Sequence, residues 1–392
     1  MPLTPSCTKI AERIQSIPPS GIRRYFDISA TMKDVISLGI GEPDFTTPRH
    51  ILEVGIQALA RGETHYTSNS GILELRQALS RKYNALYDVH FDPEDEILIT
   101  VGGSEALQLT MISLLNPGDE VIVVEPSYVA YKPSVVFAGG VPVVVETYAE
   151  NNFEVTAEDI EAKITPKTRM IFIGYPNNPT GAVLPRERLL EIAAVAQKHD
   201  LLVVSDELYD RLIYAGFKQT CFASLPGMKE RTILIAGFSK NYAMTGWRVG
   251  FIAANPTLLA AIRKTHQYII MSAPTVGQIA AIEALENGDE AVEEMRQAYD
   301  ARRQLLVNGL NQVGLKTFEP KGAFYCFPDI RSTGLTSEEF AEKLLYEEQV
   351  AVIPGTAFGD CGEGYVRMAY TSSTNQIAKA LERIGRFVKR LR

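Results

Sequence analysis

Short apolar runs alternate with amphipathic stretches through the middle of the chain. The runs hold four to six residues, are rich in Val and Ile, and are bounded by Gly, Pro or polar residues, which predicts buried strands. The expected strands are 97–100, 120–124, 141–146, 169–173, 201–205, 232–236 and 249–253, and helical spacing favours helices at 105–115 and 186–199. Continuous apolar strands separated by helices predict an α/β fold with a mostly parallel sheet covered on both faces.

The pattern changes after about residue 285. A long helix is expected at 290–313, followed by short strands near 323–328, 350–354 and 364–369, and Thr336 and Glu339 have the spacing of a capping box. The 392 residues exceed the length over which one core usually grows. We therefore predict three parts. They are an N-terminal segment (1–45) that joins the small domain or a dimer partner, a large domain (46–287) and a smaller α+β domain (288–392).

Composition excludes several classes of protein. The net charge of −8 gives no general attraction for nucleic acid or an anionic membrane. No apolar run approaches the ~18 residues of a membrane span, and no basic segment leads into an apolar core at the N-terminus. The four cysteines are scattered, without the close pairing of a metal site. We expect a cytoplasmic protein with reduced thiols, no metal, and no nucleic-acid or membrane partner.

Ligands of parallel sheets bind beyond the carboxyl ends of the strands, and polar motifs lie at those ends here. At 101–106 a strand runs through two glycines into a helix, where the amides of Gly103, Ser104 and Glu105 can bind a phosphate. A plain strand-to-helix turn is the more frequent meaning of paired glycines. Tyr128, which follows the next strand, could present its ring face to a ligand or simply pack.

Two further strand ends carry Asn178 and the pair Asp206 and Tyr209. Turn chemistry could explain the residues around Asn178, and a carboxylate at a sheet end is usually a helix cap. After the strand at 232–236 comes Ser239, followed by Lys240 among small and aromatic residues. There a lysine can lose hydration and proton affinity, as a nucleophilic amine requires.

Other candidates lie away from these strand ends. Arg248 can bind a phosphate or carboxylate with two parallel hydrogen bonds. The alternative interpretation is that Arg248 forms a surface ion pair and Lys240 is a solvated loop cation. Gly41 lies in a glycine and proline turn, and Tyr66 alone would be a half-buried loop aromatic. Arg367 lies on a predicted strand, where it either faces water or needs a partner. In the N-terminal segment, Ile22, Tyr25 and Phe26 could line an apolar pocket or pack against a partner subunit.

The run from Ser239 to Arg248, together with Asn-Pro-Thr-Gly at 178–181, resembles the signature of class I and II aminotransferases, which are pyridoxal 5'-phosphate (PLP) enzymes of fold type I. The resemblance covers the chain from about residue 20 to its end. It implies a large domain with a mostly parallel seven-stranded sheet. It also implies an obligate homodimer with composite active sites and a cis bond between Asn178 and Pro179.

The resemblance further implies a role for each candidate. Lys240 would hold PLP as a Schiff base and move the Cα proton, and Asp206 would pair with the pyridine nitrogen. Phosphate ligands would be the amides at 103–105, Ser239, Arg248 and Tyr66 of the neighbouring subunit. The other implied contacts are Tyr128 stacked on the pyridine ring, Asn178 and Tyr209 on the phenolic oxygen, and Gly41, Asn178 and Arg367 at the substrate, whose α-carboxylate Arg367 would bind.

The implied activity is transfer of the α-amino group of an L-amino acid to a 2-oxo acid, 2-oxoglutarate being the expected acceptor, in a ping-pong cycle. The same residues could support β-elimination on cysteine conjugates, as in related C–S lyases. A PLP-binding regulatory module is a further alternative, but the winged-helix domain of such proteins has no room ahead of Ser20. The helix at 104–115 has no Lys or Arg to bind a second carboxylate, so aromatic, aspartate-like and alanine-like donors remain open.

Overall fold

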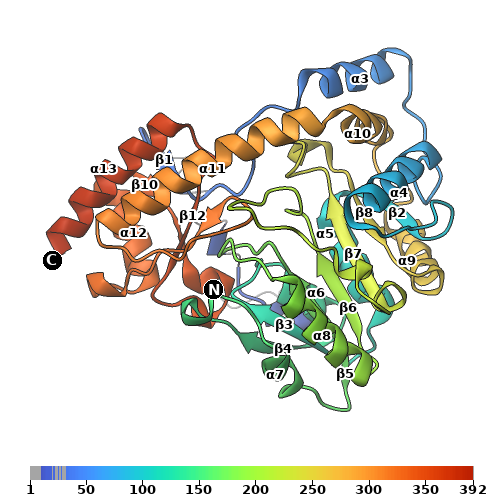
Figure 1. Ribbon diagram of the computed structural model, residues 1–392, viewed down its shortest axis with the longest axis horizontal. Coiled ribbons are helices and arrows are strands. Elements are labelled where there is room, and N and C mark those ends of the chain that lie inside the picture. Colours follow the sequence, from blue (N-terminus) through green and yellow to red (C-terminus); the bar gives the residue numbers. More distant parts are fainter. Residues whose placement is uncertain (1–9, 20, 23–24, 26–27, 29–31, 392) are drawn as a thin grey trace, which may run out of the picture.

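The computed structural model describes residues 10–19, 21–22, 25, 28 and 32–391 (Figure 1). Phe26, which we predicted to line a pocket or a partner surface, lies outside the described residues, as does Cys7. Within the described part, no helix is both long and apolar enough to cross a membrane.

A seven-stranded sheet forms the centre of the larger part of the molecule. Its strands follow the order β2-β8-β7-β6-β5-β3-β4, and β8 runs antiparallel to both of its neighbours while the other neighbouring pairs are parallel. The bounds are β2 Ile97–Thr100, β3 Glu120–Glu125, β4 Val141–Glu146, β5 Thr168–Gly174, β6 Leu202–Asp206, β7 Thr232–Gly237 and β8 Gly250–Ala253. Each predicted strand agrees with an observed one to within a residue at either end, which confirms the mostly parallel α/β fold.

Helices cover both faces of this sheet because alternate strand residues point to opposite sides. On β3, Val121 and Val123 pack on the face covered by α5, α6 and α9, whereas Ile122 and Val124 pack on the face covered by α7 and α8. Near β2 and β8 the second face is covered by α4 and α10, and α3 packs on α10. The bounds are α3 Arg49–Ala60, α4 Leu73–Tyr87, α5 Gly102–Leu114, α6 Tyr131–Phe137, α7 Ala157–Glu161, α8 Arg186–Lys198, α9 Pro256–Ile269 and α10 Thr275–Asn287.

The smaller part combines short strands with three helices. The long helix α11 (Asp289–Gln312) runs from α10 towards α12 (Ser337–Glu348) and α13 (Thr374–Leu391) (Figure 1). The strands β11 (Ile353–Pro354), β12 (Val366–Ala369) and β9 (Tyr325–Cys326) form an antiparallel sheet. The predicted capping box is present at the start of α12, between Thr336 and Glu339. The domain boundaries after residues 45 and 287 stay predictions.

All three predicted strands of this part are shorter than expected, and the one predicted at 364–369 begins only at Val366. The predicted strand at 323–328 is reduced to β9, and on its N-terminal side Ala323 has a left-handed φ of 56°, through which the strand cannot continue. The predicted strand at 350–354 is divided, because β10 (Val350–Ala351) pairs with β1 (Ile36–Ser37) while β11 pairs with β12. The helix expected at 105–115 begins earlier, at Gly102, and ends at Leu114.

The N-terminal part of the chain, which includes the short helix α1 (Glu12–Gln15), is tied to the smaller part by Tyr25 and residues 36–42. The buried Tyr25 hydroxyl donates to Glu338 Oε2 on α12. We call residues 36–42 the strap: β1 pairs in parallel with β10, and the carbonyl of Leu38 accepts a hydrogen bond from Ala369 N–H. Beyond Leu38 the strap enters the space above the carboxyl ends of the large sheet, where the candidate residues gather.

Candidate active site

A cavity of about 570 Å³ lies at the carboxyl edge of the large sheet. Strands β2, β3, β5, β6 and β7 all end at this edge because they run in the same direction. The predicted site residues that line the cavity are Gly41, Gly103, Ser104, Tyr128, Asn178, Asp206, Tyr209, Ser239, Lys240, Arg248 and Arg367. The structure therefore brings together segments that extend from residue 41 to residue 367.

Lys240 lies just past β7 and its exposed part faces the cavity. Its Nζ donates a 2.7 Å hydrogen bond to the Gly41 carbonyl of the strap and lies 5.6 Å from the centre of the Phe324 ring. Loss of water around the ammonium lowers the Lys240 pKa to about 8, more than nearby Glu42 raises it, and Arg367 adds to the lowering. A substantial fraction of this amine is therefore neutral near physiological pH, as a nucleophile or a general base requires.

Asp206 ends β6 on the same side of the cavity. Its Oδ2 accepts a 2.8 Å hydrogen bond from the Tyr131 hydroxyl, and its Oδ1 accepts from Leu208 N–H. Burial raises the Asp206 pKa to about 6, against the lowering effects of the Tyr131 hydroxyl, the Leu208 amide and Lys240. A buried carboxylate with a raised pKa favours a cationic partner, such as a protonated ring nitrogen. Such a partner would stabilise the charged form of Asp206.

Arg367 on β12 is almost completely buried, with 2% of its surface exposed. Its guanidinium donates to Asn178 Oδ1 at 3.0 Å and to the Gly39 carbonyl at 2.6 Å, and lies over the Tyr325 ring at 4.6 Å. None of these partners carries a negative charge, and burial lowers the Arg367 pKa. Its Nε is buried without a partner among the described residues. A buried cation with neutral partners and an unused donor is suited to bind a carboxylate ligand.

Asn178 and Tyr209 also line the cavity. Asn178 uses its carbonyl oxygen for Arg367, which leaves the NH2 end of the amide to face a ligand. The Tyr209 hydroxyl lies 3.0 Å from the Tyr325 hydroxyl, and both rings are buried. Tyr128 lines the cavity with its ring edge-to-face against Tyr131, 5.7 Å between centres.

The part of the cavity beside Arg248 is suited to an anion. Arg248 has a left-handed φ of 57° and donates to the Thr245 carbonyl. Its guanidinium lies against Gly102, where a Cβ would be 2.6 Å from Nη2. The first turn of α5 has no side-chain cap from Val101, so its N–H groups remain available to a ligand. A guanidinium and the N-terminus of a helix, side by side, form a site for a phosphate.

Two predicted residues lie elsewhere. The Glu105 carboxylate contacts His266 and Val101 N–H, and Glu105 does not line the cavity. Tyr66 is 81% exposed and also lies outside the cavity. Of the N-terminal residues, Ile22 lines the cavity, whereas Tyr25 packs in the core.

One expectation about this site is wrong. The cis peptide bonds among the described residues are Glu125–Pro126 and Tyr175–Pro176, and the Asn178–Pro179 bond is not cis. Here Asn177 fixes the turn instead: its Oδ1 accepts from Thr180 N–H and its carbonyl accepts from Gly181 N–H. The Asn178 amide therefore points into the cavity without a cis bond before Pro179.

Sequence reasoning missed two tyrosines that complete the site. Tyr131 supplies the hydrogen bond to Asp206, and its spacing of three from Tyr128 at the start of α6 was the available signal. Tyr325 contacts Tyr209 and Arg367 and lies 3.4 Å from the Gly41 carbonyl. Nothing local marked Tyr325, because its partners are distant in the sequence. No group of three or more His, Cys, Asp or Glu side chains in the described part of the chain could hold a metal.

The comparisons with known proteins all indicate the same family. The family described as aminotransferase class I and II matches residues 33–384. The chain is 47% identical to an aspartate aminotransferase from Pyrococcus abyssi, and 46% identical to aromatic-amino-acid aminotransferase 2 from Thermococcus litoralis. Each of these two alignments covers 97% of this chain and 98% of the relative.

A solved structure of aspartate aminotransferase from Thermus thermophilus with maleate superposes with a TM-score of 0.92 at 40% identity, covering 96% of this chain and 99% of that one. The lysine, carboxylate and arginine of the cavity are thus set in a fold shared over nearly the full length of both chains. The chain belongs to aminotransferase class I and II, a family of generally PLP-dependent enzymes that act on amino acids and keto acids.

Proposed function

We propose that this enzyme transfers the α-amino group of an L-amino acid to a 2-oxo acid, 2-oxoglutarate being the acceptor, in a ping-pong cycle on PLP. The observation that carries the proposal is the grouping, in one cavity, of an amine with a pKa of about 8, a buried carboxylate and a buried arginine with an unused donor. These groups match the needs of a proton transfer at Cα next to a bound α-carboxylate.

The residues of the cavity fit PLP. The uncapped first turn of α5 and Arg248 would hold the phosphate together with Ser239. Asp206, whose pKa is raised by burial, would hold the ring nitrogen in its protonated form, with Tyr128 against the ring and Tyr209 and Asn178 at the phenolic oxygen. Bound PLP supplies a protonated ring that accepts the electron pair released when a bond at Cα breaks.

The chain's own groups then perform the remaining tasks. Arg367 binds the α-carboxylate through its guanidinium and orients the Cα–H bond towards Lys240. The Lys240 Nζ would accept the proton from Cα as a general base and release it as a general acid to the cofactor and not back to Cα, and its lowered pKa makes both transfers feasible near neutral pH. Tyr131 keeps Asp206 in place through its hydroxyl. The strap excludes water from this side, because Gly39 and Gly41 lie against Arg367 and Tyr325.

The activity is tested with purified PLP-loaded enzyme and single amino acids in the absence of any 2-oxo acid. The panel includes aspartate, phenylalanine, tyrosine and alanine, because the relatives include aspartate and aromatic aminotransferases. We expect about one equivalent of 2-oxo acid per subunit and then no more until 2-oxoglutarate is added. The Lys240→Ala variant is the control and is expected to release none.

A C–S lyase would give a different result. Continuous release of pyruvate and ammonia from a cysteine conjugate, without an acceptor, would support the alternative β-elimination. It would also contradict the proposed transamination if no 2-oxo acid were formed from the rest of the panel.

We further propose a homodimer in which Tyr66 completes the phosphate site of the partner. Support comes from the 81% exposure of Tyr66 outside its own cavity. The apolar side chains of Ile56, Leu59 and Tyr268 are also exposed on this chain. Apolar groups exposed in this way are frequent at interfaces.

Mixing two defective variants tests the shared site. If Tyr66 acts on the partner, a mixed dimer of Lys240→Ala and Tyr66→Ala subunits contains one intact site, and refolding the two together restores activity. Activity no higher than the sum of the separate variants would contradict the composite site.

The cytoplasm is the proposed location, supported by the free thiols of Cys221, Cys326 and Cys361.

A further inference from the structure

A buried histidine stands behind the first turn of α5. His266 on α9 is fully buried, and its Nδ1 lies 2.8 Å from Glu105 Oε1. The other oxygen of this carboxylate accepts a hydrogen bond from Val101 N–H, at the N-cap of α5. Glu105 therefore connects α9 to the residue that precedes the phosphate-facing turn.

The remaining ring nitrogen determines the form of the histidine. His266 Nε2 is buried and has no partner among the described residues. A doubly protonated ring would bury an N–H group without an acceptor, which is unfavourable. The Nδ1–H group is therefore the donor of the hydrogen bond to the Glu105 carboxylate.

This contact bears on the amides that face the cavity. Val101 offers no side chain to cap α5, so Glu105 fixes the entry of the helix by holding Val101 N–H. Once Val101 is fixed, the next N–H groups keep one direction, towards the guanidinium of Arg248 beside Gly102. An anion site made of main-chain groups depends on such alignment, because a main-chain donor cannot be turned independently.

We infer that His266 is a positioning residue for the phosphate end of the active site, acting through Glu105 on the first turn of α5. The inference rests on the proposed function, since it assumes that a phosphate group binds there. His266 also accepts hydrogen bonds from Ile270 and Met271 N–H, but these bonds use its main-chain carbonyl. Side-chain replacements leave them in place, so a loss caused by the imidazole can be separated from an effect on the end of α9.

The experiment compares the affinities of the cofactor-free full-length enzyme for PLP and for pyridoxal, which lacks the phosphate. Trp247, the only tryptophan of the chain and the neighbour of Arg248, reports binding by its fluorescence. For His266→Leu we expect PLP affinity to fall about tenfold, as for loss of one charge-assisted hydrogen bond, with pyridoxal affinity unchanged. His266→Asn, which keeps a donor near the position of Nδ1, is expected to recover most of the PLP affinity.

Ser113→Ala is the matched control. The Ser113 hydroxyl donates to Thr265 Oγ1 at 2.7 Å, which is a second contact between α5 and α9, away from the cavity. This variant should retain the affinity for PLP. Equal losses for PLP and pyridoxal in His266→Leu, or no loss of either, would overturn the inference.

The single variant Glu105→Gln covers the case in which His266→Leu fails to fold. An amide at residue 105 has one oxygen and cannot serve both Val101 N–H and the imidazole as a carboxylate does, so Glu105→Gln alone should also weaken PLP more than pyridoxal. Where all variants fold, the double variant should lose no more PLP affinity than whichever single variant binds PLP more weakly. Additive losses of PLP affinity would overturn the inference. If the unaltered enzyme takes up no PLP, the proposed function itself fails.

Discussion

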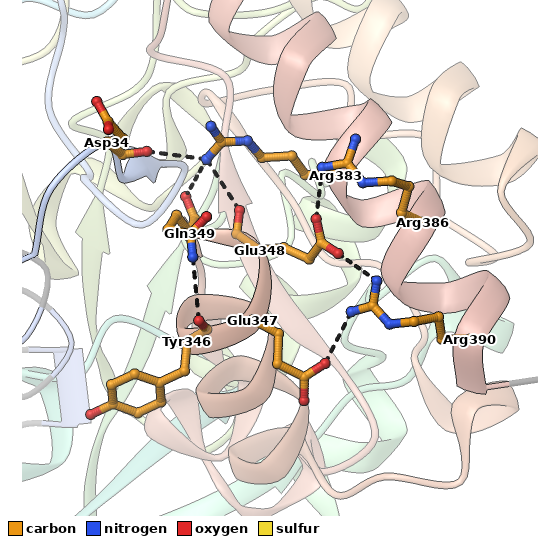
Figure 2. A network of polar contacts seen from close by, with 8 residues as sticks. All are labelled: Asp34, Tyr346, Glu347, Glu348, Gln349, Arg383, Arg386 and Arg390. Atoms are coloured by element: carbon orange, nitrogen blue, oxygen red, sulfur yellow. Dashed lines mark hydrogen bonds and ion pairs between the residues drawn. The ribbon is translucent and has the colours of Figure 1, made fainter.

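Arginines serve opposite purposes in two regions of this molecule. In the cavity, Arg367 is buried among Asn178, the Gly39 carbonyl and aromatic rings, with no carboxylate beside it. On α13, by contrast, Arg386 and Arg390 both donate to the buried Glu348, and Arg390 also contacts Glu347 (Figure 2). Arg383 donates to the carbonyls of Asp34, Glu348 and Gln349 (Figure 2).

The difference lies in which charges are already balanced. The α13 arginines close the C-terminal end of α12, where carbonyl groups lack helical partners and a cation suits the helix dipole. Burial among neutral neighbours lowers the Arg367 pKa. The buried charge is therefore unfavourable for the free energy of folding, and a ligand carboxylate can offset this. The first group supports the structure, while Arg367 stays available to the carboxylate that we propose it binds.

The largest expected effect is the loss of Arg367. Arg367→Met should lower kcat/KM for the amino acid about 10²- to 10⁴-fold, because a buried charge partner of the α-carboxylate is removed. The same change should leave the free energy of unfolding without substrate unchanged or higher, as a buried unpaired cation is replaced by an apolar chain. Steady-state kinetics and urea denaturation measure the two quantities. Marked destabilisation of Arg367→Met would contradict the comparison.

Lys240 extends the comparison to a second cation without a salt bridge, one that is partly buried. Its pKa is lowered from 10.5 to about 8, so between these values the unfolded chain binds more protons than the folded one and stability rises with pH. The cofactor-free wild type should therefore gain up to about 3 kcal/mol relative to Lys240→Met between pH 8 and 10.5. If the free energies of unfolding of the two proteins changed equally with pH over this range, Lys240 would not be desolvated in the folded protein.

Glu348→Gln removes a charge that stabilises the fold, whereas Lys240→Met removes one that costs stability. Burial raises the Glu348 pKa, but Arg390 and Arg386 more than offset this and hold it below its ordinary value. Removing the charge should lower the free energy of unfolding by about 1–3 kcal/mol at pH 7 and leave kcat/KM unchanged. Since the stabilisation is lost as the pH falls below 4.5, the deficit of the variant should shrink in acid. Urea denaturation at pH 7 and pH 4 tests this, and a deficit that persists in acid would exclude the charge as its cause.

Arg383→Met should give the smallest change. Its acceptors are main-chain carbonyls, so we expect a loss of about 1 kcal/mol that does not vary between pH 4 and pH 7. The same denaturation series measures it beside Glu348→Gln. A pH-dependent loss would mean that Arg383 acts through Glu348 and not through the carbonyls.

The sequence predicted the seven strands well because buried parallel strands are continuous apolar runs. It placed Lys240, Asp206 and Asn178 at one edge because all of their strands end there. It could not indicate Tyr325, whose hydroxyl meets Tyr209 across 116 residues, nor the division of 350–354, which depends on pairing with β1. Such features arise from contacts between distant segments, which local periodicity does not report. The direction of the Glu105 carboxylate was likewise invisible until α9 was placed beside α5.

The strap has a consequence for synthesis of the chain on the ribosome. The Gly39 carbonyl and its donor Arg367 are separated by 328 positions, and β1 needs β10 as its pairing partner. At typical elongation rates of about 5–20 residues per second, the strap therefore waits roughly 16–66 s for the partners that bury it. A nascent chain that stops before residue 367 carries Lys240 and Asp206 but lacks the arginine that we propose binds the α-carboxylate, so we expect incomplete translation products to be inactive.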